Sequence, residues 1–384
     1  MAEDRYGEDR GTEGINAASK SGAPNAEAPQ EEVDRIARAK RREGRWFWMF
    51  TREAREAKGV FFWVGWLVAA ICAGLSVVAM LWSFEPEPFD VAQHAAHAAK
   101  MNGKNVVVGF TTTATAIRIV DTLLNKPGGY LSNDKLPPGV FMDNIPRWEW
   151  GVLQQVRDLI KIMRNDFSRA QSQGAEDADL RDAEPRFNID TEAWMFPAAE
   201  DEYAAGAEKL TSYLNRLNDD NEYEAQFFAR ADNLVTYLDV VEKKLGAMSQ
   251  RLTASVGQDR INTDLAGDSG ARRSTPTPDE RTVKTAWMRL DDEFYEARGA
   301  TWALIHILEA IDTDFKDILE KKNARISLKQ VVRELHRTQE SVWSPCILNG
   351  SGFGWEANHS LVMASYISRA NASIIGLKNL LQQG

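Results

Sequence analysis

The longest apolar run in the chain covers residues 60–84, VFFWVGWLVAAICAGLSVVAMLWSF, and contains no charged residue. As an α-helix, which rises about 1.5 Å per residue, it would be about 37 Å long, enough to cross a hydrocarbon core of roughly 30 Å. Its glycines are compatible with a helix, because lipid offers the backbone no other hydrogen-bond partners. The pattern therefore predicts a transmembrane helix at residues 60–84 rather than the core helix of a soluble protein.

After this run, apolar positions recur at alternating spacings of three and four residues. The stretches are Trp148–Ala170, Tyr203–Leu217, Phe227–Leu252, Val283–Ile318, Leu328–Val342 and Met363–Leu381. A sustained period near 3.5 is typical of helices packed parallel or antiparallel, and we expect a mainly α fold: a single N-terminal transmembrane helix followed by an elongated periplasmic helical bundle. The fourth stretch, if continuous, is a helix of roughly 55 Å, which Gly299 weakens and allows to bend. Ser327 and Gln330 are placed as a capping box for the fifth.

Shorter elements are expected between the apolar run and the first of these helices. Residues 90–101 are expected to form a helix, and residues 105–110, NVVVGF, a short β-branched strand. A further helix is expected to reach Leu124 from Thr111–Thr113, whose hydroxyl groups can cap its first turn. Residues 131–144, which contain adjacent prolines, are expected to form an ordered loop.

The composition changes along the chain and suggests a domain division. Residues 1–30 contain almost no large apolar groups and cannot bury enough surface to fold. Residues 257–281 combine glycine, proline and polar groups and are the best candidate for a mobile linker. The predicted parts are a disordered cytoplasmic tail (1–30), a basic-aromatic juxtamembrane segment (31–58), the transmembrane helix (60–84), a periplasmic helical subdomain (85–256), a flexible linker (257–281) and a C-terminal helical subdomain (282–384).

Aromatic and basic residues flank the apolar run on its N-terminal side, and aromatic residues lie near both of its ends. Tryptophan rings favour the membrane–water boundary, and cations favour anionic head groups. The predicted membrane-interface residues are Arg41, Arg42, Arg45, Trp46, Trp48, Trp63, Trp66 and Trp82. A basic-aromatic patch also suits nucleic acid, but its position beside a membrane span favours lipid. The lipid bilayer is therefore the expected partner of residues 31–58, and nucleic acid is not.

Charge gives the expected orientation. The net charge of −10 comes from residues after the apolar run, because basic and acidic residues balance before it. Basic residues crowd the N-terminal side of the run, and the first one after it is Lys100, so the positive-inside rule places the N-terminus in the cytoplasm. We expect a single-pass protein of the cell inner membrane with its C-terminal domain in the periplasm. In this topology Cys72 and Cys346 cannot pair within one molecule, and Cys346 is expected to be buried.

Residues with catalytic or ligand-binding chemistry are present, but they form no recognisable constellation. Glu149, Asp166 and the acids of residues 176–184 could supply the paired carboxylates of a glycosidase, although a solvated acidic loop is the simpler interpretation. This loop, residues 173–197, is expected to pack its apolar residues on the bundle: Phe187, Trp194, Met195 and Phe196.

His94 and His97 share one helical face but lack a third ligand, and His306 is expected to be a core group. Residues 349–354, NGSGFG, lack the lysine of a phosphate loop and are expected to connect helices. No cofactor, no metal and no assigned catalytic residue follow from these patterns.

Several blocks of the sequence resemble a known family. They are residues 121–133 (DTLLNKPGGYLSN), 136–140 (LPPGV), 168–173 (SRAQSQ) and 184–188 (EPRFN). They are similar to the signature blocks of a domain-of-unknown-function family of single-span inner-membrane proteins of Proteobacteria, and the resemblance covers most of residues 60–384. It implies a compartment and a topology, but it implies no activity and no site residues.

The leading hypothesis is therefore a membrane-anchored envelope scaffold or interaction module that binds an envelope protein or a second copy of itself. The alternative is a membrane-anchored enzyme directed at peptidoglycan that uses paired carboxylates. A sensory receptor fits less well, because two spans usually bracket a sensory bundle and few residues precede this one. The sequence favours a protein that is not an enzyme.

Overall fold

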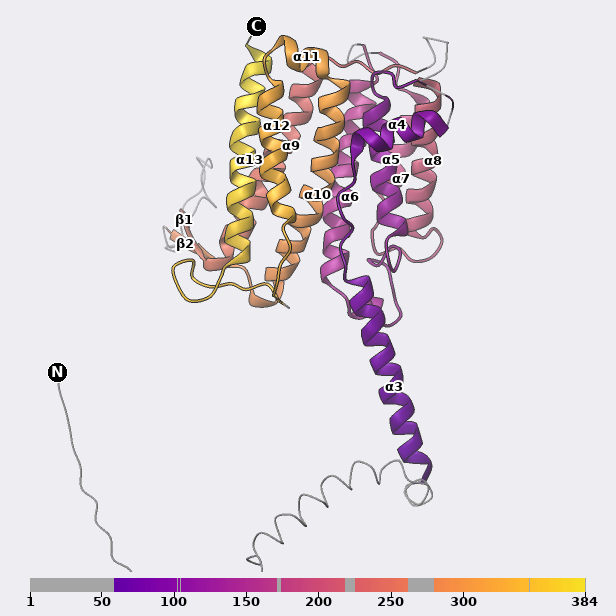
Figure 1. The fold of residues 1–384 in the computed structure, drawn as a ribbon, viewed down its shortest axis with the longest axis vertical. Helices are drawn as coiled ribbons and strands as arrows, with labels where there is room; N and C mark the ends of the chain where they lie inside the picture. Colours follow the sequence, from indigo (N-terminus) through magenta and orange to yellow (C-terminus); the bar gives the residue numbers. More distant parts are fainter. Residues whose placement is uncertain are drawn as a thin grey trace, which may run out of the picture. The chain divides into compact units, whose positions relative to one another are not determined.

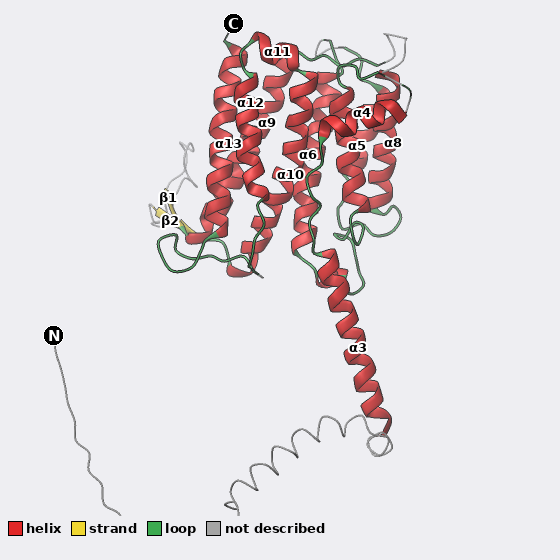
Figure 2. Cartoon of the chain, viewed as in Figure 1, coloured by secondary structure: helices red, strands yellow, loops and turns green. Residues whose placement is uncertain are grey.

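The computed structural model of the chain describes residues 59–101, 103, 105–170, 174–217, 225–261, 280–344 and 346–383. The described residues are mainly helical, as the sequence predicts (Figure 2). The chain divides into two compact units, residues 1–71 and 72–384, with the boundary inside helix α3. We call residues 72–384 the helical unit. The predicted tail (1–30) and juxtamembrane segment (31–58) lie outside the described residues.

Helix α3, Gly59–Trp82, coincides with the predicted apolar run. Among the described residues it is the one helix long and apolar enough to cross a membrane, with a mean hydropathy of 2.3 over Phe62–Trp82. No side chain in that window is buried within the protein. Its length and composition therefore match the sequence-based prediction.

The other helices belong to the helical unit. They are α4 (Val91–Met101), α5 (Phe110–Asn125), α6 (Asn144–Ile162), α7 (Ala178–Phe187), α8 (Ala199–Leu217), α9 (Ala231–Thr253), α10 (Leu290–Asp314), α11 (Lys316–Lys321), α12 (Arg325–His336) and α13 (His359–Gln382). Short helical turns are η1 (Gly139–Phe141), η2 (Met163–Phe167), η3 (Ala254–Val256), η4 (Trp287–Arg289) and η5 (Arg337–Gln339). Strands β1 (Gln258–Ile261) and β2 (Glu280–Val283) form an antiparallel pair.

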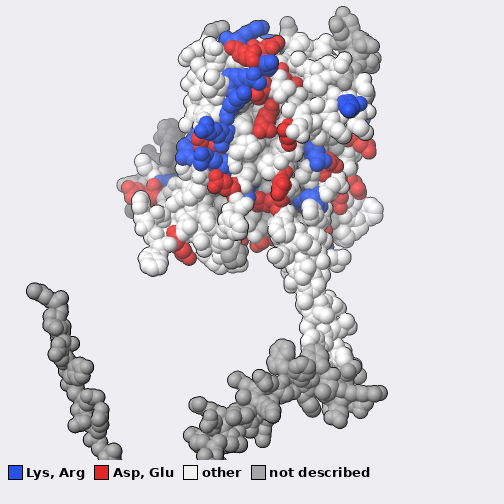
Figure 3. Space-filling view, in the orientation of Figure 1, with Lys and Arg blue, Asp and Glu red and all other residues white. Residues whose placement is uncertain are grey.

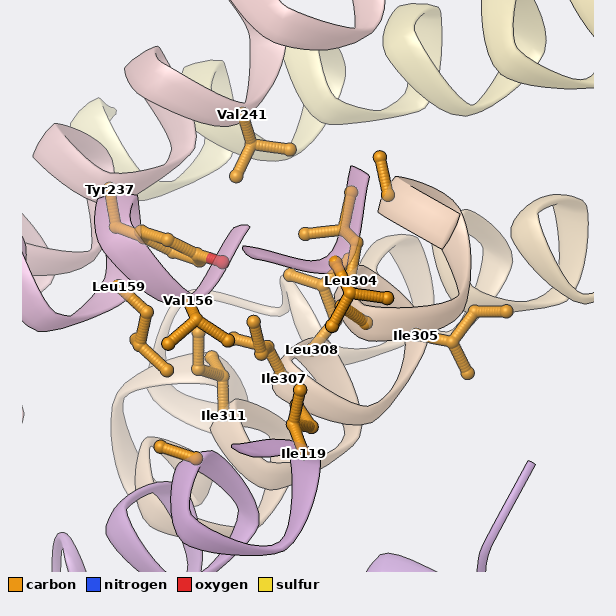
Figure 4. Packing of buried hydrophobic residues seen from close by; sticks show 14 of the residues in the cluster. Ile119, Val156, Leu159, Tyr237, Val241, Leu304, Ile305, Ile307, Leu308 and Ile311 are labelled. Carbon is orange, nitrogen blue, oxygen red and sulfur yellow. The ribbon is translucent and has the colours of Figure 1, made fainter. Parts of the chain in front are cut away.

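Most helices of this unit lie side by side, with α10 packed against α6, α5 and α12 (Figure 1). Helix α13 packs on α9 and α12, and α8 packs on α5 and α7. Figure 4 shows α6 and α10 side chains facing each other, including Val156, Ile307 and Ile311. One hydrophobic cluster contains residues from both 85–256 and 282–384. The linker boundary proposed between these segments stays a prediction.

Two glycines allow α6 and α10 to touch backbone to backbone. A Cβ atom on Gly299 of α10 would lie 2.0 Å from the carbonyl oxygen of Trp148, and one on Gly151 of α6 would lie 2.1 Å from that of Glu296. Both distances are far below van der Waals contact, so only glycine fits. The sequence suggested a weakened or bent helix at Gly299, and the structure shows a close helix crossing there.

The start of α5 is stabilised from a distant part of the chain. The predicted threonine caps are wrong, because Thr111–Thr113 lie inside the helix and are buried. The carboxylate of Asp314, at the end of α10, instead accepts hydrogen bonds from the backbone N–H and the hydroxyl of Thr112, both at 2.7 Å. A carboxylate at a helix N-terminus also interacts favourably with the helix dipole. Burial raises the pKa of Asp314 to about 6.

The predicted helix over residues 283–318 is shorter in the structure. Val283 belongs to β2 and Trp287 to η4, so α10 begins only at Leu290 and is about 37 Å long. Acidic residues occupy its first turn, where they suit the positive end of the helix dipole. At its other end the backbone turns at Phe315 before α11 begins.

Three further local predictions are wrong. Residues 105–110 form no strand, and Phe110 already belongs to α5. Residues 173–197 contain α7, in which Phe187 is buried, whereas Trp194, Met195 and Phe196 are exposed rather than packed on the core. Helix α12 begins at Arg325 after Ala324, so the Ser327 capping box does not form.

Candidate functional site

Glu149, the first of the predicted carboxylates, belongs to α6 and is buried in the core. Its carboxylate accepts hydrogen bonds from the backbone N–H of Leu131 at 2.8 Å and of Ser132 at 2.9 Å. Lys126 forms an ion pair with it at 2.5 Å, and both side chains have 0% exposure. Gly128, in the left-handed region at φ 89°, lets the intervening loop turn back towards the carboxylate.

This arrangement makes Glu149 a structural residue. Burial raises the pKa of Glu149, while the Lys126 ammonium and the hydrogen-bond donors act in the opposite direction. A fully buried carboxylate cannot reach an external substrate. The Pro-Gly-Gly-Tyr block that carries the family resemblance is therefore the loop that wraps around this buried ion pair.

Asp166 is far from Glu149. It belongs to η2, which continues α6, and its backbone oxygen accepts a hydrogen bond from the side chain of Asn233 at 2.9 Å. A separation of 17 residues along one helical run corresponds to roughly 25 Å. Paired glycosidase carboxylates lie only about 5–9.5 Å apart, so Glu149 and Asp166 do not form such a pair.

The acids of residues 176–184 hold α7 in place. Arg164 bonds to Glu176 at 2.8 Å and to Glu184 at 2.6 Å. Asp177 accepts hydrogen bonds from the first backbone N–H groups of α7. Arg216 of α8 pairs with Asp177 at 2.8 Å and with Asp179 at 2.6 Å. These carboxylates are engaged in ion pairs that join α7 to its neighbours.

The histidines form no metal site among the residues that the structure describes, where no group of three metal-ligating side chains occurs. His94 lines a hollow of about 500 Å³ together with Arg118 and Asp121. Burial and the Arg118 guanidinium lower the pKa of His94. In this hollow Arg118 forms an ion pair with Asp121 at 2.7 Å.

His306 is a buried core group, as the sequence predicts. Its Nδ1 lies 2.7 Å from the carbonyl oxygen of Trp302 and its Nε2 accepts the backbone N–H of Phe89 at 3.0 Å. The two bonds fix the neutral tautomer with the proton on Nδ1. Burial lowers the pKa of His306 to about 4, and its ring stacks on Phe89 with centroids 4.0 Å apart.

Residues 349–354 form part of a connection between α12 and α13, as predicted. Asn349 donates a hydrogen bond to the carbonyl oxygen of Ser255 at 2.9 Å, and Gly352 adopts a positive φ of 84°. Cys346, in the same connection, is exposed. The prediction of a buried Cys346 is therefore wrong.

The predicted membrane-interface residues fall into two groups. Arg41, Arg42, Arg45, Trp46 and Trp48 lie outside the described residues. Trp63 and Trp66 are exposed near the start of α3, whereas Trp82 is partly buried at its end. The place of all these residues at a membrane boundary stays a prediction.

Trp82 packs against the loop that follows α5. A Cβ atom on Gly128, which has a positive φ, would lie 2.8 Å from the Trp82 ring. We call this end of the helical unit the Trp82 end; its four loops comprise the described residues 126–143, 188–198, 254–261 with 280–289, and 337–344 with 346–358.

Hydrogen bonds between loops and an ion pair between two helix starts connect the segments of the Trp82 end. Asn133 donates to the carbonyl oxygen of Ala193 at 2.9 Å, which links the first two loops. Arg147 and Asp292, in the first turns of α6 and α10, form an ion pair at 3.3 Å. The bond from residue 349 to Ser255, described above, joins the last two loops.

A buried arginine that the sequence analysis missed connects the chain after α3 to this end. Arg298 of α10 pairs with Glu85 at 2.5 Å and donates to the carbonyl oxygens of Thr338 and Glu340 at 3.1 and 2.7 Å. Glu85 and Arg298 are 213 positions apart in the sequence, so no local pattern could indicate the pair.

Exposed aromatic side chains gather at the Trp82 end. We define the exposed aromatic set as Phe84, Phe141, Trp194, Phe196, Trp287, Trp343, Phe353 and Trp355. Trp343, Phe353 and Trp355 are almost fully exposed, at 97%, 104% and 108%. After α3, the described residues contain no other Phe or Trp side chain that is exposed.

The opposite end of the helical unit differs in composition. Its exposed large apolar side chains are the aliphatic Met101, Val106, Val108 and Ile326. On the face seen in Figure 3, basic and acidic side chains lie mostly over the helices, and the lower margin is largely white. The two ends therefore differ: exposed Phe and Trp side chains lie at the Trp82 end, and exposed aliphatic side chains lie at the opposite end.

Comparison with known proteins gives a family. A family model described as an uncharacterized protein conserved in bacteria (DUF2333) matches residues 55–384. No curated protein and no solved structure matches the chain.

Proposed function

The chain belongs to the DUF2333 family of uncharacterised bacterial proteins, and from this premise we propose that it is a membrane-anchored scaffold or interaction module of the bacterial envelope. Helix α3 crosses the inner membrane once. The N-terminus is cytoplasmic, and residues 85–384 form an elongated helical bundle in the periplasm. The bundle binds an envelope protein or a second copy of the chain.

Helix α3 is the observation that carries this proposal. Its window Phe62–Trp82 is apolar and uncharged, and no side chain in it is buried within the protein. Exposing apolar surface to water costs about 25 cal/mol per Å², and a bilayer removes this cost along the whole helix. Lysine and arginine residues cluster directly before α3, and the first one after it is Lys100, which supports a cytoplasmic N-terminus.

The contacts after α3 support a scaffold with a fixed geometry. Trp82 packs on Gly128, and Glu85 pairs with the buried Arg298. Because Trp82 ends the apolar window and Glu85 follows shortly after it, the chain passes from α3 into folded contacts rather than into a long tether. This short connection supports an anchored scaffold over a freely tethered domain.

The alternative, a peptidoglycan-directed enzyme, receives no support from the carboxylates that suggested it. Glu149 is buried and paired, and Asp166 lies roughly 25 Å away along the same helical run. The acids of residues 176–184 are paired with arginines. No second function is favoured by a specific contact among the described residues.

Crosslinking of the full chain in its native membrane, followed by mass spectrometry, tests the proposal. We expect reproducible links between surface lysines of the helical unit and one envelope complex, or links between identical residues of two copies. The same protein solubilised in detergent is the matched control, since accidental neighbours in the membrane disperse there and specific partners stay bound. Recovery of an unlinked monomer under both conditions would refute the interaction module.

A further inference from the structure

The exposed aromatic set is unusual because separate parts of the chain contribute to it at one end of the unit. Single exposed apolar residues are ordinary in soluble proteins. Here residue 84 and all four loops of the Trp82 end contribute Phe or Trp side chains, and the opposite end contributes none among the described residues. An exposed apolar surface of this kind indicates an interaction site.

The position of the set points to lipid as the occupant. Trp82 ends the apolar window of α3 and contacts Gly128, in the loop that continues to Phe141. If α3 crosses a membrane, the hydrocarbon boundary lies at this end of the helical unit. Folded contacts, rather than a tether, then hold the aromatic loops close to that boundary.

The chemistry of the loops also fits a lipid interface. Tryptophan is enriched at membrane–water interfaces, and tryptophan and phenylalanine are typical of the apolar face of segments that lie in the interface. Residues 341–358 carry three of these aromatic side chains and a single charged residue, Glu356. Attraction to anionic head groups therefore contributes little, and zwitterionic lipid is sufficient for binding.

We propose that the Trp82 end of the helical unit docks on the surface of the membrane that α3 crosses, with the exposed aromatic set inserted in its interfacial region. This inference rests on the proposed membrane anchor and adds an orientation: the loops of the Trp82 end face the lipid, and the opposite end points away from it. The surface that remains free for a protein partner then lies along the helices and at the opposite end.

The native cysteines provide two reporters in the full chain. The Cys346→Ala variant keeps Cys72, inside α3, and the Cys72→Ser variant keeps Cys346, which is exposed in the loop that contains Trp343, Phe353 and Trp355. A control variant with Met101→Cys and both native cysteines replaced reports on the opposite end, where Met101 is 73% exposed. Each protein is labelled with an NBD dye and reconstituted into phosphatidylcholine vesicles.

Two quenchers then locate each dye. Lipids brominated along the acyl chain quench dyes in the bilayer, and aqueous iodide quenches dyes in water. We expect brominated lipid to remove most of the emission from the Cys72 and Cys346 dyes, and iodide to quench the control at Met101→Cys. Replacing Trp343, Phe353 and Trp355 with serine should transfer the Cys346 dye from lipid quenching to iodide quenching. These side chains are almost fully exposed, so the fold does not depend on them.

The outcomes separate this inference from the anchor on which it rests. Lipid quenching at Cys72 with only iodide quenching at Cys346 would overturn the docking and leave the membrane span intact. Iodide quenching at Cys72 would overturn the span itself. A Cys346 dye that is shielded from both quenchers in vesicles but is quenched by iodide in nanodiscs holding one copy each would mean that a second copy, rather than lipid, covers the loops. This result would also overturn the docking.

Discussion

Replacing Glu149 with glutamine tests whether this carboxylate is structural. The substitution keeps the shape of the side chain and removes its charge, which leaves Lys126 buried at 0% exposure without its ionic partner. Breaking a buried ion pair in this way costs about 3–5 kcal/mol. The backbone N–H groups of Leu131 and Ser132, which donate to the carboxylate in the parent protein, would then donate to a neutral amide at best. We therefore expect Glu149→Gln to lower the free energy of unfolding by about 3–5 kcal/mol.

Urea unfolding of the full chain in detergent micelles measures this change, because Trp148 beside Glu149 is fully buried and reports on the same region. The double variant Lys126→Met, Glu149→Gln removes both charges and should be less destabilised than the sum of its two single variants. The exposed Glu192→Gln is the matched control and should leave stability unchanged. A Glu149→Gln variant within about 1 kcal/mol of the parent protein, or additive effects in the double variant, would refute a structural ion pair.

Three further substitutions test the packing of the helical unit. Gly299→Ala should lower the free energy of unfolding by about 1–3 kcal/mol, because the new Cβ would lie 2.0 Å from a backbone oxygen of α6. The control Gly376→Ala, with open space around it, should not lower it. Equal unfolding midpoints for the two variants would contradict the close helix crossing. His306 has a folded pKa of about 4, below its ordinary value of 6.5, so its contribution to stability is complete above pH 6.5 and is lost as the pH falls towards 4, by about 3 kcal/mol. The free energy of unfolding, measured between pH 6.5 and 4, should fall in the parent protein and fall less in His306→Gln, whose side chain cannot be protonated. An identical pH dependence in the two proteins would refute the neutral tautomer. Asp314→Ala should lower stability by about 1–3 kcal/mol and speed amide exchange in the first turn of α5, and unchanged exchange there would contradict the distant cap.

Periodicity predicts the existence of the long helices but not their limits. Helices α6, α8, α9 and α13 lie where apolar residues recur at spacings of three and four. Val283 and Trp287 follow the same spacing as α10, yet they belong to β2 and η4. Spacing records which residues could share a helical face, and it does not record where the backbone leaves the helix.

Contacts between distant residues could not be predicted from the sequence. Asp314 caps a helix that begins about 200 residues earlier, and Arg298 meets Glu85 across 213 residues. The sequence could not predict which aromatic residues of the loops are buried. Phe187 and Trp194 lie in one acidic segment, but only Phe187 enters the core. Composition identifies such residues as candidates for the core, and only the packed fold decides which of them are exposed.

The central claim is that α3 crosses the membrane once and places the helical unit on the far side. Alkaline phosphatase fused after Gly384 tests it, because this enzyme folds through disulfides that form only in an oxidising compartment. We expect the phosphatase fusion to be active in intact cells, and deletion of residues 60–84 to abolish that activity. An inactive phosphatase fusion in cells where a green fluorescent protein fusion at the same position is bright would place the helical unit in the cytoplasm and contradict the account.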